Sequence, residues 1–300
     1  MQTYERRKLR FLSNDWAVML ITGQMKPSLL GLCVKQAIVE IVAVGNELLI
    51  GKTLDTNSHW LATQTSRLGG VLRQITTVRD RPEEIANAVG DALSRRPDFL
   101  LTLGGLGPTH DDITLLSIGR LLKRRLVLNR EALELLRARY LRFGPGVKLT
   151  PPRLKMAKFP EGAKPLPNPV GTAPAPCLAV HGTTMVALPG VPKEMRAIFR
   201  SSIAPMIERF GGRHRFYEHS LLLRGIPESS LSPKIDEVMR KHRHVFIKSH
   251  PRGIEKDGSA RIELHFRIGG TSPEKSIAEL NHAVVLMKKK LRGSATVRDA

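Results

Sequence analysis

The stretch that decides the fold runs from Asp98 to Thr114 and reads DFLLTLGGLGPTHDDIT. Its first part is a short apolar run, which predicts a buried strand. Three glycines follow within four positions, at 104, 105 and 107. Glycine lets the chain turn sharply through positive φ, and such a turn can leave backbone N–H groups pointing outward to hold an anion. The stretch therefore predicts a strand that leads into a phosphate-binding loop.

The second half of this stretch carries two adjacent carboxylates. Thr109 and Asp112 have the spacing of a capping box, so we expect a helix to begin here with the positive end of its dipole near the glycines. Asp111 and Asp112 would repel a phosphate bound at the loop unless a divalent cation lay between them, and Mg²⁺ is usually held by one or two carboxylates with phosphates and waters. The alternative is that the acids only complement the helix dipole, worth about 0.3–1 kcal/mol each.

Strands and helices alternate on both sides of this loop. An apolar run at 37–44 ends at Gly45-Asn46-Glu47, and the candidate N-cap residues 55–58 open a helix that stops at Gly69-Gly70. A strand at 71–78 and a helix at 82–95 follow. Strands that alternate with helices of this length predict an α/β fold with a mostly parallel sheet, which binds ligands at the carboxyl ends of its strands.

Composition excludes several classes of protein. The chain has 300 residues, 41% of them hydrophobic and 5% aromatic, with a net charge of +21. Because the charge is spread along the chain and the aromatic residues are few, we expect no specific nucleic-acid partner. No apolar segment is long enough to cross a membrane, and two cysteines fit a reducing, cytoplasmic location. We expect small-molecule substrates and a homo-oligomer, most simply a dimer.

The pattern divides the chain into three parts. Residues 1–36 form an N-terminal extension, of which 1–24 can be an appendage, and residues 37–212 form the α/β domain. Within the α/β domain, nine prolines between 144 and 176 predict an ordered, wrapping loop. Residues 213–300 follow a strand–helix–strand–strand–helix order, which predicts a small α+β domain.

Five motifs in this order resemble the amino-terminal part of the CinA (competence/damage-inducible) family, which carries a molybdopterin-binding domain of the MoaB and MogA type. The resemblance covers about residues 37–291. The matching segments are Gly45–Gly51 with Thr56-Asn57, the loop Gly104–Thr114, Asn168 with Gly171–Ala173, Leu188–Met195, and Gly225–Ser229.

The resemblance implies a three-layer α/β domain, a KH-like second domain, and metal-dependent hydrolysis of a dinucleotide pyrophosphate such as ADP-ribose, that is, an ADP-ribose pyrophosphatase-like enzyme. The chain ends without the nicotinamide-nucleotide deamidase domain that full-length CinA proteins carry. It also has Asp111 where the related adenylyltransferases have arginine. That exchange removes a phosphate clamp and adds a metal ligand, which favours hydrolysis over adenylyl transfer.

The working hypothesis gives each motif a role. Asp111 and Asp112 hold a divalent metal, Mg²⁺ or else Mn²⁺ or Co²⁺, and act in catalysis with Glu47, which positions water or a second metal. The expected substrate- and phosphate-binding residues come from all five motifs. They are Gly45, Asp55, Thr56, Asn57, Gly104, Gly105, Leu106, Gly107, Pro108, Thr109, Thr114, Asn168, Gly171, Pro189 and Gly190. For Asp55 an N-cap role is equally open, and Pro189-Gly190 can simply position a helix.

Two other functions stay open from the sequence. The domain can bind molybdopterin or a nucleotide without hydrolysis, although paired acids favour turnover. The KH-like domain can bind RNA, but neither Gly225 nor Gly253 begins the Gly-x-x-Gly clamp that KH domains use.

Overall fold

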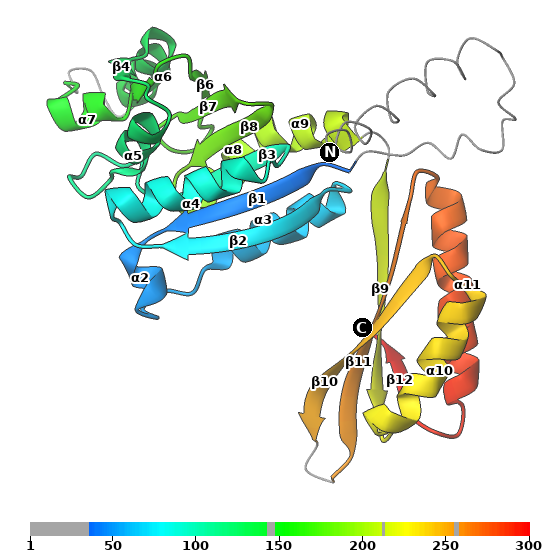
Figure 1. The fold of residues 1–300 in the computed structure, drawn as a ribbon. Helices are drawn as coiled ribbons and strands as arrows, with labels where there is room; N and C mark the ends of the chain where they lie inside the picture. Colours follow the sequence, from blue (N-terminus) through cyan, green and yellow to red (C-terminus); the bar gives the residue numbers. More distant parts are fainter. Residues whose placement is uncertain (1–35, 143–147, 212–213, 255–257) are drawn as a thin grey trace, which may run out of the picture. The chain divides into compact units, whose positions relative to one another are not determined.

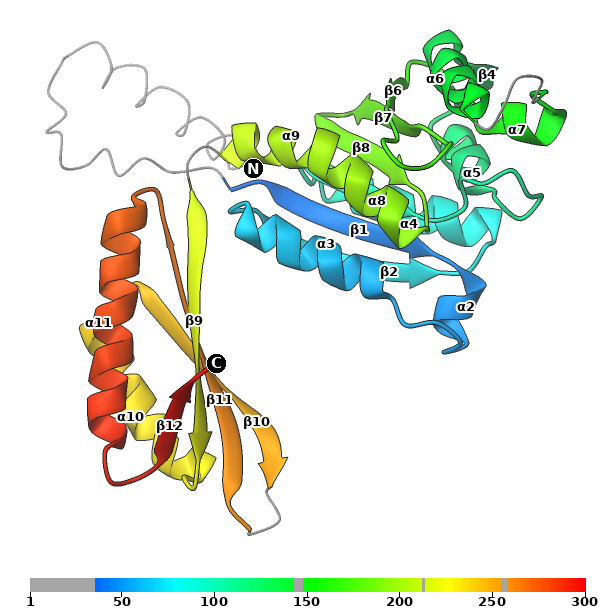
Figure 2. The same ribbon diagram turned by 180° about the vertical axis from the view of Figure 1, so that it is seen from behind.

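The computed structural model describes residues 36–142, 148–211, 214–254 and 258–300 (Figures 1 and 2). Its first sheet has six strands in the order β2-β1-β3-β8-β7-β6. These strands are β1 Ile38–Val44, β2 Val71–Val78, β3 Phe99–Leu103, β6 Lys164–Leu166, β7 Ala175–Val180 and β8 Thr183–Leu188. β2, β1, β3 and β8 run parallel, whereas β7 pairs antiparallel with both β8 and β6. The predicted α/β fold with a mostly parallel sheet is therefore confirmed.

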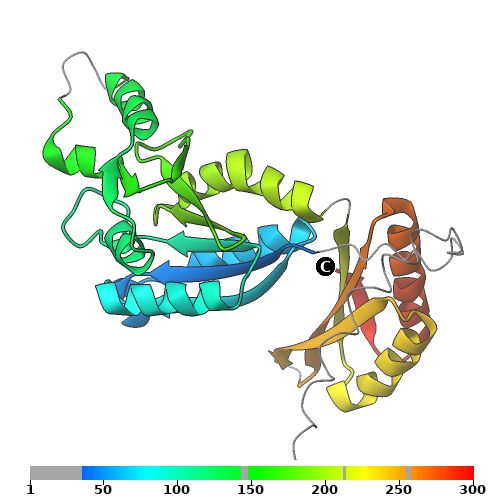
Figure 3. The same ribbon diagram turned by 45° about the horizontal axis from the view of Figure 1, so that its top comes forward.

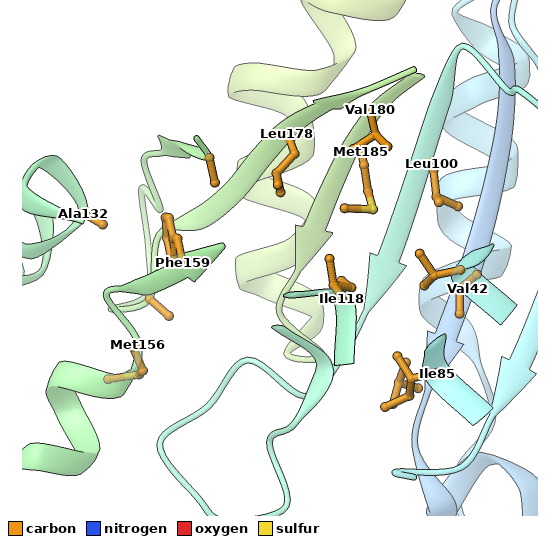
Figure 4. Packing of buried hydrophobic residues seen from close by; sticks show 14 of the residues in the cluster. Val42, Ile85, Leu100, Ile118, Ala132, Met156, Phe159, Leu178, Val180 and Met185 are labelled. Carbon is orange, nitrogen blue, oxygen red and sulfur yellow. The ribbon is translucent and has the colours of Figure 1, made fainter. Parts of the chain in front are cut away.

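Helices cover both faces of this sheet, because its central strands are apolar on both sides. Val39, Ile41 and Ala43 of β1 pack with helices α3, α8 and α9, while Val42 and Val44 pack with α4, α5 and α6. The bounds are α2 Asn46–Leu49, α3 Thr56–Arg67, α4 Pro82–Ser94, α5 Thr114–Leu121, α6 Arg130–Leu141, α8 Pro192–Ile198, the π-helix η1 Phe199–Ile203 and α9 Ala204–Gly211. Figure 4 shows side chains of the second of these clusters, among them Val42, Ile85, Leu100 and Ile118.

The proline-rich segment is more regular than the sequence predicts. Residues 143–147 lie outside the described part of the chain, and after them come α7 Pro151–Lys155, β5 Lys158–Pro160 and β6. β5 pairs with β4, Leu126–Leu128, a strand that we did not expect. Phe159 of β5 is 1% exposed and belongs to the core beside α5. The segment therefore wraps the domain, as predicted, and is anchored by burial of this side chain.

One strand of the sheet carries a buried charge. Glu40 in the middle of β1 is 1% exposed. Its Oε1 accepts a hydrogen bond of 2.6 Å from Nε of Arg73, and its Oε2 accepts one of 2.6 Å from Nη2 of Arg95. Burial opposes ionisation of Glu40, but the hydrogen bonds from Arg95 and Arg73 outweigh it and hold its pKa below the ordinary value. Glu40 thus joins β1 to β2 and to the end of α4.

The second domain has a separate four-stranded sheet in the order β10-β11-β9-β12. The elements are β9 Arg215–Arg224, α10 Glu228–Lys241, β10 Val245–Ile254, β11 Ala260–Gly270, α11 Pro273–Leu291 and β12 Thr296–Asp299. The expected strand–helix–strand–strand–helix order is present, and β12 is an addition that the sequence did not predict. In Figure 3 the yellow and orange helices lie on one side of this sheet.

The divisions at 36/37 and 212/213 stay predictions, since 1–35 and 212–213 lie outside the described residues. Among the helices that are described, none is long and apolar enough to span a bilayer.

Candidate functional site

A pocket of about 530 Å³ lies at the carboxyl ends of β1, β3 and β8. β1 and β2 end beside α2 at this edge of the sheet (Figure 1). The pocket gathers most of the predicted site residues, from segments far apart in the sequence. Those that line it are Gly45, Glu47, Asp55, Thr56, Asn57, Gly104, Gly105, Leu106, Gly107, Pro108, Asp111, Asp112, Pro189 and Gly190.

Two glycines of the loop after β3 are required by its geometry. Gly104 has φ 94°, and a Cβ there would lie 2.4 Å from the carbonyl oxygen of Val44. Gly105 has φ 66°, and its Cβ would lie 2.1 Å from Oγ1 of Thr114. Both the positive φ and the close approach exclude a side chain. The predicted glycine turn is present, and neighbouring backbone and helix α5 surround it closely.

The loop presents fewer free N–H groups than three glycines suggest. The N–H of Gly104 donates to the carbonyl of Leu188 at 3.0 Å and extends the sheet pairing of β3 with β8. Within the described part of the chain, no hydrogen bond occupies the N–H groups of Gly105, Leu106 and Gly107. These consecutive groups, rather than Gly104, can hold an anion.

The helix after the loop starts later than the capping-box spacing predicts. α5 begins at Thr114, and the N–H and hydroxyl of Thr109 both donate to Oδ2 of Asp112. Asp112 therefore closes a turn before the helix instead of capping it. Thr114 is buried and donates from its hydroxyl to the carbonyl of Gly104 at 2.9 Å, so it positions the loop without lining the pocket.

Asp111 is the freer of the two acids, with a side chain that is 66% exposed. The Thr109 hydroxyl lies within hydrogen-bonding reach of both carboxylates. That hydroxyl, the backbone N–H of Asp111 and the positive charge of Lys155 hold the pKa of Asp111 below its ordinary value. Asp111 therefore faces the pocket as a carboxylate at neutral pH.

The start of α3 forms a second wall of the pocket. Oδ1 of Asp55 accepts the N–H of Ser58 at 2.9 Å, which confirms the N-cap role for Asp55. Nδ2 of Asn57 donates to the carbonyl of Gly190 at 2.7 Å and ties α3 to the turn before α8. Oδ1 of Asn57 is buried and has no partner among the described residues. An unpaired buried acceptor at a pocket wall is suited to a ligand N–H.

Asn168 and Gly171 hold the site together from outside it. Nδ2 of Asn168 donates to Oε2 of Glu194 at 2.6 Å and to the carbonyl of Ala173 at 3.0 Å, while Oδ1 accepts the N–H of Gly171 at 2.7 Å. These contacts shape the loop that brings Thr172 and Ala173 to the pocket. Neither Asn168 nor Gly171 lines the pocket, and Thr109 is likewise outside it.

Sequence reasoning missed several residues of this region, among them Asp80, Glu194, Met156 and Lys155. Asp80, Glu194 and Met156 line the pocket, and Nζ of Lys155 donates to the carbonyl of Thr109. Asp80 follows the end of β2, which is the positional signal that could have identified it. Glu194 lies in the quoted motif at 188–195, but nothing in the sequence pairs it with Asn168. Lys155 and Met156 come from the wrapping segment, whose path no local pattern reveals.

The charges of the lining are one-sided. Six carboxylates line the pocket, and none of its described lining residues is lysine or arginine. They are Glu47, Asp55, Asp80, Asp111, Asp112 and Glu194. Lys155 adjoins the loop from outside this lining. In the described residues no three His, Cys, Asp or Glu side chains are placed to hold a metal ion. The expected metal site needs only Asp111 and Asp112 with phosphate and water, so it stays a prediction.

Comparison with known proteins identifies the domain. Residues 40–209 match the family model described as a probable molybdopterin binding domain. A protein of Pyrobaculum calidifontis is 41% identical over 85% of this chain and 97% of its own length. One of Pyrobaculum aerophilum is 45% identical over 80% of this chain and 88% of its own. The crystal structure of the protein CinA with unknown function from Thermoplasma acidophilum is 37% identical, with a TM-score of 0.53, and covers 57% of this chain and 98% of that one.

These findings correct one prediction. The chain is not an ADP-ribose pyrophosphatase-like hydrolase, because the family that it matches is a molybdopterin-binding one. The structure supplies the physical reason that the motif misled us. Asp112 closes the turn with Thr109, so part of its hydrogen-bonding capacity is already used. The roles given to Asp111, Asp112 and Glu47 are not tested by these findings and stay predictions.

Proposed function

We propose, since the chain belongs to the family of probable molybdopterin binding domains, that its pocket binds a molybdopterin-type pterin or a nucleotide and does not hydrolyse it. The observation that carries this proposal is the division of the pocket into an acidic wall and a loop of free N–H groups. Such a pocket matches a ligand with a donor-rich heterocycle at one end and a phosphate at the other.

The acidic wall supports recognition of the heterocycle. Glu47 and Glu194 line the pocket together with Asn57, whose Oδ1 is buried and unpartnered among the described residues. Carboxylate and amide oxygens accept hydrogen bonds from ring N–H and amino groups. A pterin carries an amino group beside ring N–H groups, so it can donate to several of these oxygens at once. A ligand of acceptors alone would leave the carboxylates facing other negative atoms.

The glycine loop supports binding of the phosphate. The N–H groups of Gly105, Leu106 and Gly107 are the anion donors, and Lys155 adds a positive charge beside them. Oriented backbone N–H groups and one nearby ammonium are a sufficient cradle for a phosphate monoester.

We propose that a divalent cation, Mg²⁺ or else Mn²⁺ or Co²⁺, binds only together with the ligand. Asp111, the more exposed of the two acids, is the residue that would hold it first, and Asp112 can contribute only Oδ1, because its Oδ2 accepts both donors of Thr109. The cation would neutralise the repulsion between the Asp111 carboxylate and the ligand's phosphate.

The narrower assignments are proposals as well. We propose that the chain is a CinA-type protein, on the motifs quoted from the sequence and on its likeness to the solved CinA structure, which covers 57% of this chain. We propose that the second domain is KH-like on its strand–helix–strand–strand–helix order alone. A crystal structure of the second domain would test the KH-like assignment.

The proposal is tested by fluorescence titration with a phosphorylated 6-alkyl pterin and with AMP, each with and without Mg²⁺. We expect saturable binding of at least one of them. Glu47→Gln should weaken that binding by about tenfold, the loss of one hydrogen bond to a charged group. Glu83→Gln is the matched control, since Glu83 is an exposed acid in the first turn of α4, outside the pocket.

Two outcomes would contradict the proposal. One is the absence of saturable binding by either ligand. The other is an equal loss of affinity in Glu47→Gln and Glu83→Gln, which would show a general charge effect instead of a contact in the pocket. Release of AMP from ADP-ribose, measured in separate samples of the same protein with and without Mg²⁺, would contradict binding without hydrolysis.

A further inference from the structure

The segment between β1 and α3 extends past the end of the first sheet. We call residues 46–54 the arm. Figures 1 and 2 show its helix, α2, beyond the carboxyl ends of β1 and β2, and none of the residues of α2 is buried. Backbone hydrogen bonds hold its shape. The N–H of Ile50 donates to the carbonyl of Asn46 at 3.1 Å, and the N–H of Thr53 donates to the carbonyl of Glu47 at 3.1 Å. The arm is therefore a regular structure that is little buried by its own chain.

The arm exposes large aliphatic side chains. Leu49 is 51% exposed, Ile50 is 74% exposed and Leu54 is 82% exposed. Single exposed aliphatic residues are ordinary on a protein surface, whereas three of them between positions 49 and 54 form a patch. Leu54 also lines the pocket, together with the exposed Val191 before α8. Covering the patch would remove apolar surface from water at the mouth of the pocket, which favours association.

One acid and one base flank the centre of the arm. Glu47 lies two residues before Leu49, and Lys52 lies two residues after Ile50. Both charged side chains are exposed, and neither has an ion-pair or hydrogen-bond partner among the described residues. In a twofold contact, a residue that meets a second residue of the other copy is matched by the reverse pair. Two arms packed antiparallel would therefore place the apolar centres together and each Glu47 against the other copy's Lys52.

We propose that two copies of the chain associate through their arms about a twofold axis, and that each copy supplies Lys52 to the pocket of the other. The inference rests on the proposed function for the ligand of that pocket. Glu47 of the arm lines the pocket, whereas Lys52 of the same chain does not. Six carboxylates and no lysine or arginine make up the charged part of the described lining. A lysine of the second copy beside Glu47 adds the positive charge that an anionic ligand requires.

The charges around the arm favour a second copy over a lipid surface. An anionic bilayer attracts basic residues, and here it would meet one lysine and the carboxylates of the pocket. A second copy instead presents an acid to each base and a base to each acid by symmetry alone. The apolar centre and the charged ends of the arm are thus complementary to the same surface on another copy.

The first test measures the mass of the full chain by sedimentation velocity without ligand, over a range of protein concentrations. We expect the parent to form a dimer. Ile50→Asp places a charge at the apolar centre in both copies and should weaken the dimer by at least about a hundredfold. Val285→Asp makes the same change of charge at a position of α11 that is 64% exposed. This control should dimerise within about threefold of the parent.

A second test exchanges the charges of the arm. Glu47→Lys and Lys52→Glu each put like charges opposite each other in both halves of the contact, so each variant alone should weaken the dimer by about tenfold or more. An equimolar mixture of the two variants should dimerise within about threefold of the parent, because every contact then joins opposite charges. Glu83→Lys and Lys275→Glu make the same changes at exposed positions outside the arm, and each should keep the parent's dimer affinity.

A third test measures ligand binding by fluorescence titration with the phosphorylated pterin and AMP. Lys52→Gln should lower the affinity for the ligand that the parent binds by about fivefold, although Lys52 does not line the pocket of its own chain. Lys275→Gln, at an exposed position of α11, should bind that ligand within about twofold of the parent.

Four results would overturn the inference. They are a parent that stays monomeric at every concentration, equal dimer affinities for Ile50→Asp and Val285→Asp, a mixture of the charge variants that dimerises no better than each alone, and a dimer in which Lys52→Gln binds the ligand as the parent does. Ligand binding by a monomeric parent would contradict this inference alone. A dimer that forms through the arm and binds neither ligand would contradict the proposed function and leave the contact between the arms supported.

Discussion

The carboxylates of Glu40 and Glu47, on either side of the end of β1, have opposite environments. Glu40 lies in the middle of the strand, is 1% exposed, and is held by Arg73 and Arg95. Glu47 follows the strand and lines a pocket whose described lining includes no lysine or arginine. An acid that supports the fold is neutralised by the protein, whereas an acid that faces a pocket leaves its hydrogen-bonding capacity for a ligand.

The largest expected effect on stability comes from removing the carboxylate of Glu40. Glu40→Ala leaves two arginines without their shared partner, and we expect the free energy of unfolding in urea to fall by about 3 kcal/mol. The estimate is at the low end for a buried pair because both arginine side chains are one-third exposed. Glu83→Ala, on the surface of α4, should cost less than about 1 kcal/mol. A loss of less than about 1 kcal/mol for Glu40→Ala would show that the arginines are satisfied by water.

The next prediction concerns the glycine loop of the pocket. Gly105→Ala forces a Cβ to within 2.1 Å of the Thr114 hydroxyl at a positive φ. Gly182, in the turn between β7 and β8, also has a positive φ, of 87°, but the Cβ of Gly182→Ala would have no atom within 4 Å. The control should lose about 1 kcal/mol of stability, and Gly105→Ala at least about 1 kcal/mol more, together with ligand binding. Equal losses of stability, with ligand binding retained, would show that the loop relaxes freely.

The acid dependence of stability tests how much the ion pairs of Glu40 contribute. Glu40 has a pKa below 4.5 in the folded state, so its contribution is fully present above the unfolded pKa and disappears as the pH falls through the folded pKa. We expect Glu40→Gln to lose less stability than the parent when urea unfolding is repeated from pH 6 down to pH 3. Parallel curves for the two proteins would mean that the ion pair contributes nothing to acid stability.

The smallest expected effect concerns Lys155. The Lys155 ammonium adjoins the loop, so Lys155→Met should lower the affinity for a phosphorylated pterin by about fivefold. This is near the effect of losing one partly exposed charge contact. The same variant should bind the dephosphorylated pterin within about twofold of the parent. An equal effect on both ligands, measured by the fluorescence titration, would place Lys155 in a structural role only.

Much of this molecule could be predicted from local patterns. The strands at 71–78 and 99–103 and the helices at 228–241 and 273–291 have the expected bounds, because their apolar period is regular and Gly or Pro marks their ends. β4 and β12 escaped because strands of three and four residues hold too few side chains to show a period. The start of α5 was misplaced because Thr109 and Asp112, at the spacing of a cap, form a separate turn.

The sequence by itself predicted most of the residues that line the site, since the glycine loop follows a buried strand and its neighbours form recognisable motifs. Tertiary structure alone decided what each residue does there. In the folded chain the N–H of Gly104 donates to the sheet, the carboxylate of Asp112 accepts a hydrogen bond within a turn, and the amide of Asn168 donates to Glu194. Folding also brought Asp80, Met156 and Glu194 to the pocket. The physical reason is that hydrogen bonds and strand register join residues far apart in the chain, so a group's availability depends on partners that no local pattern contains.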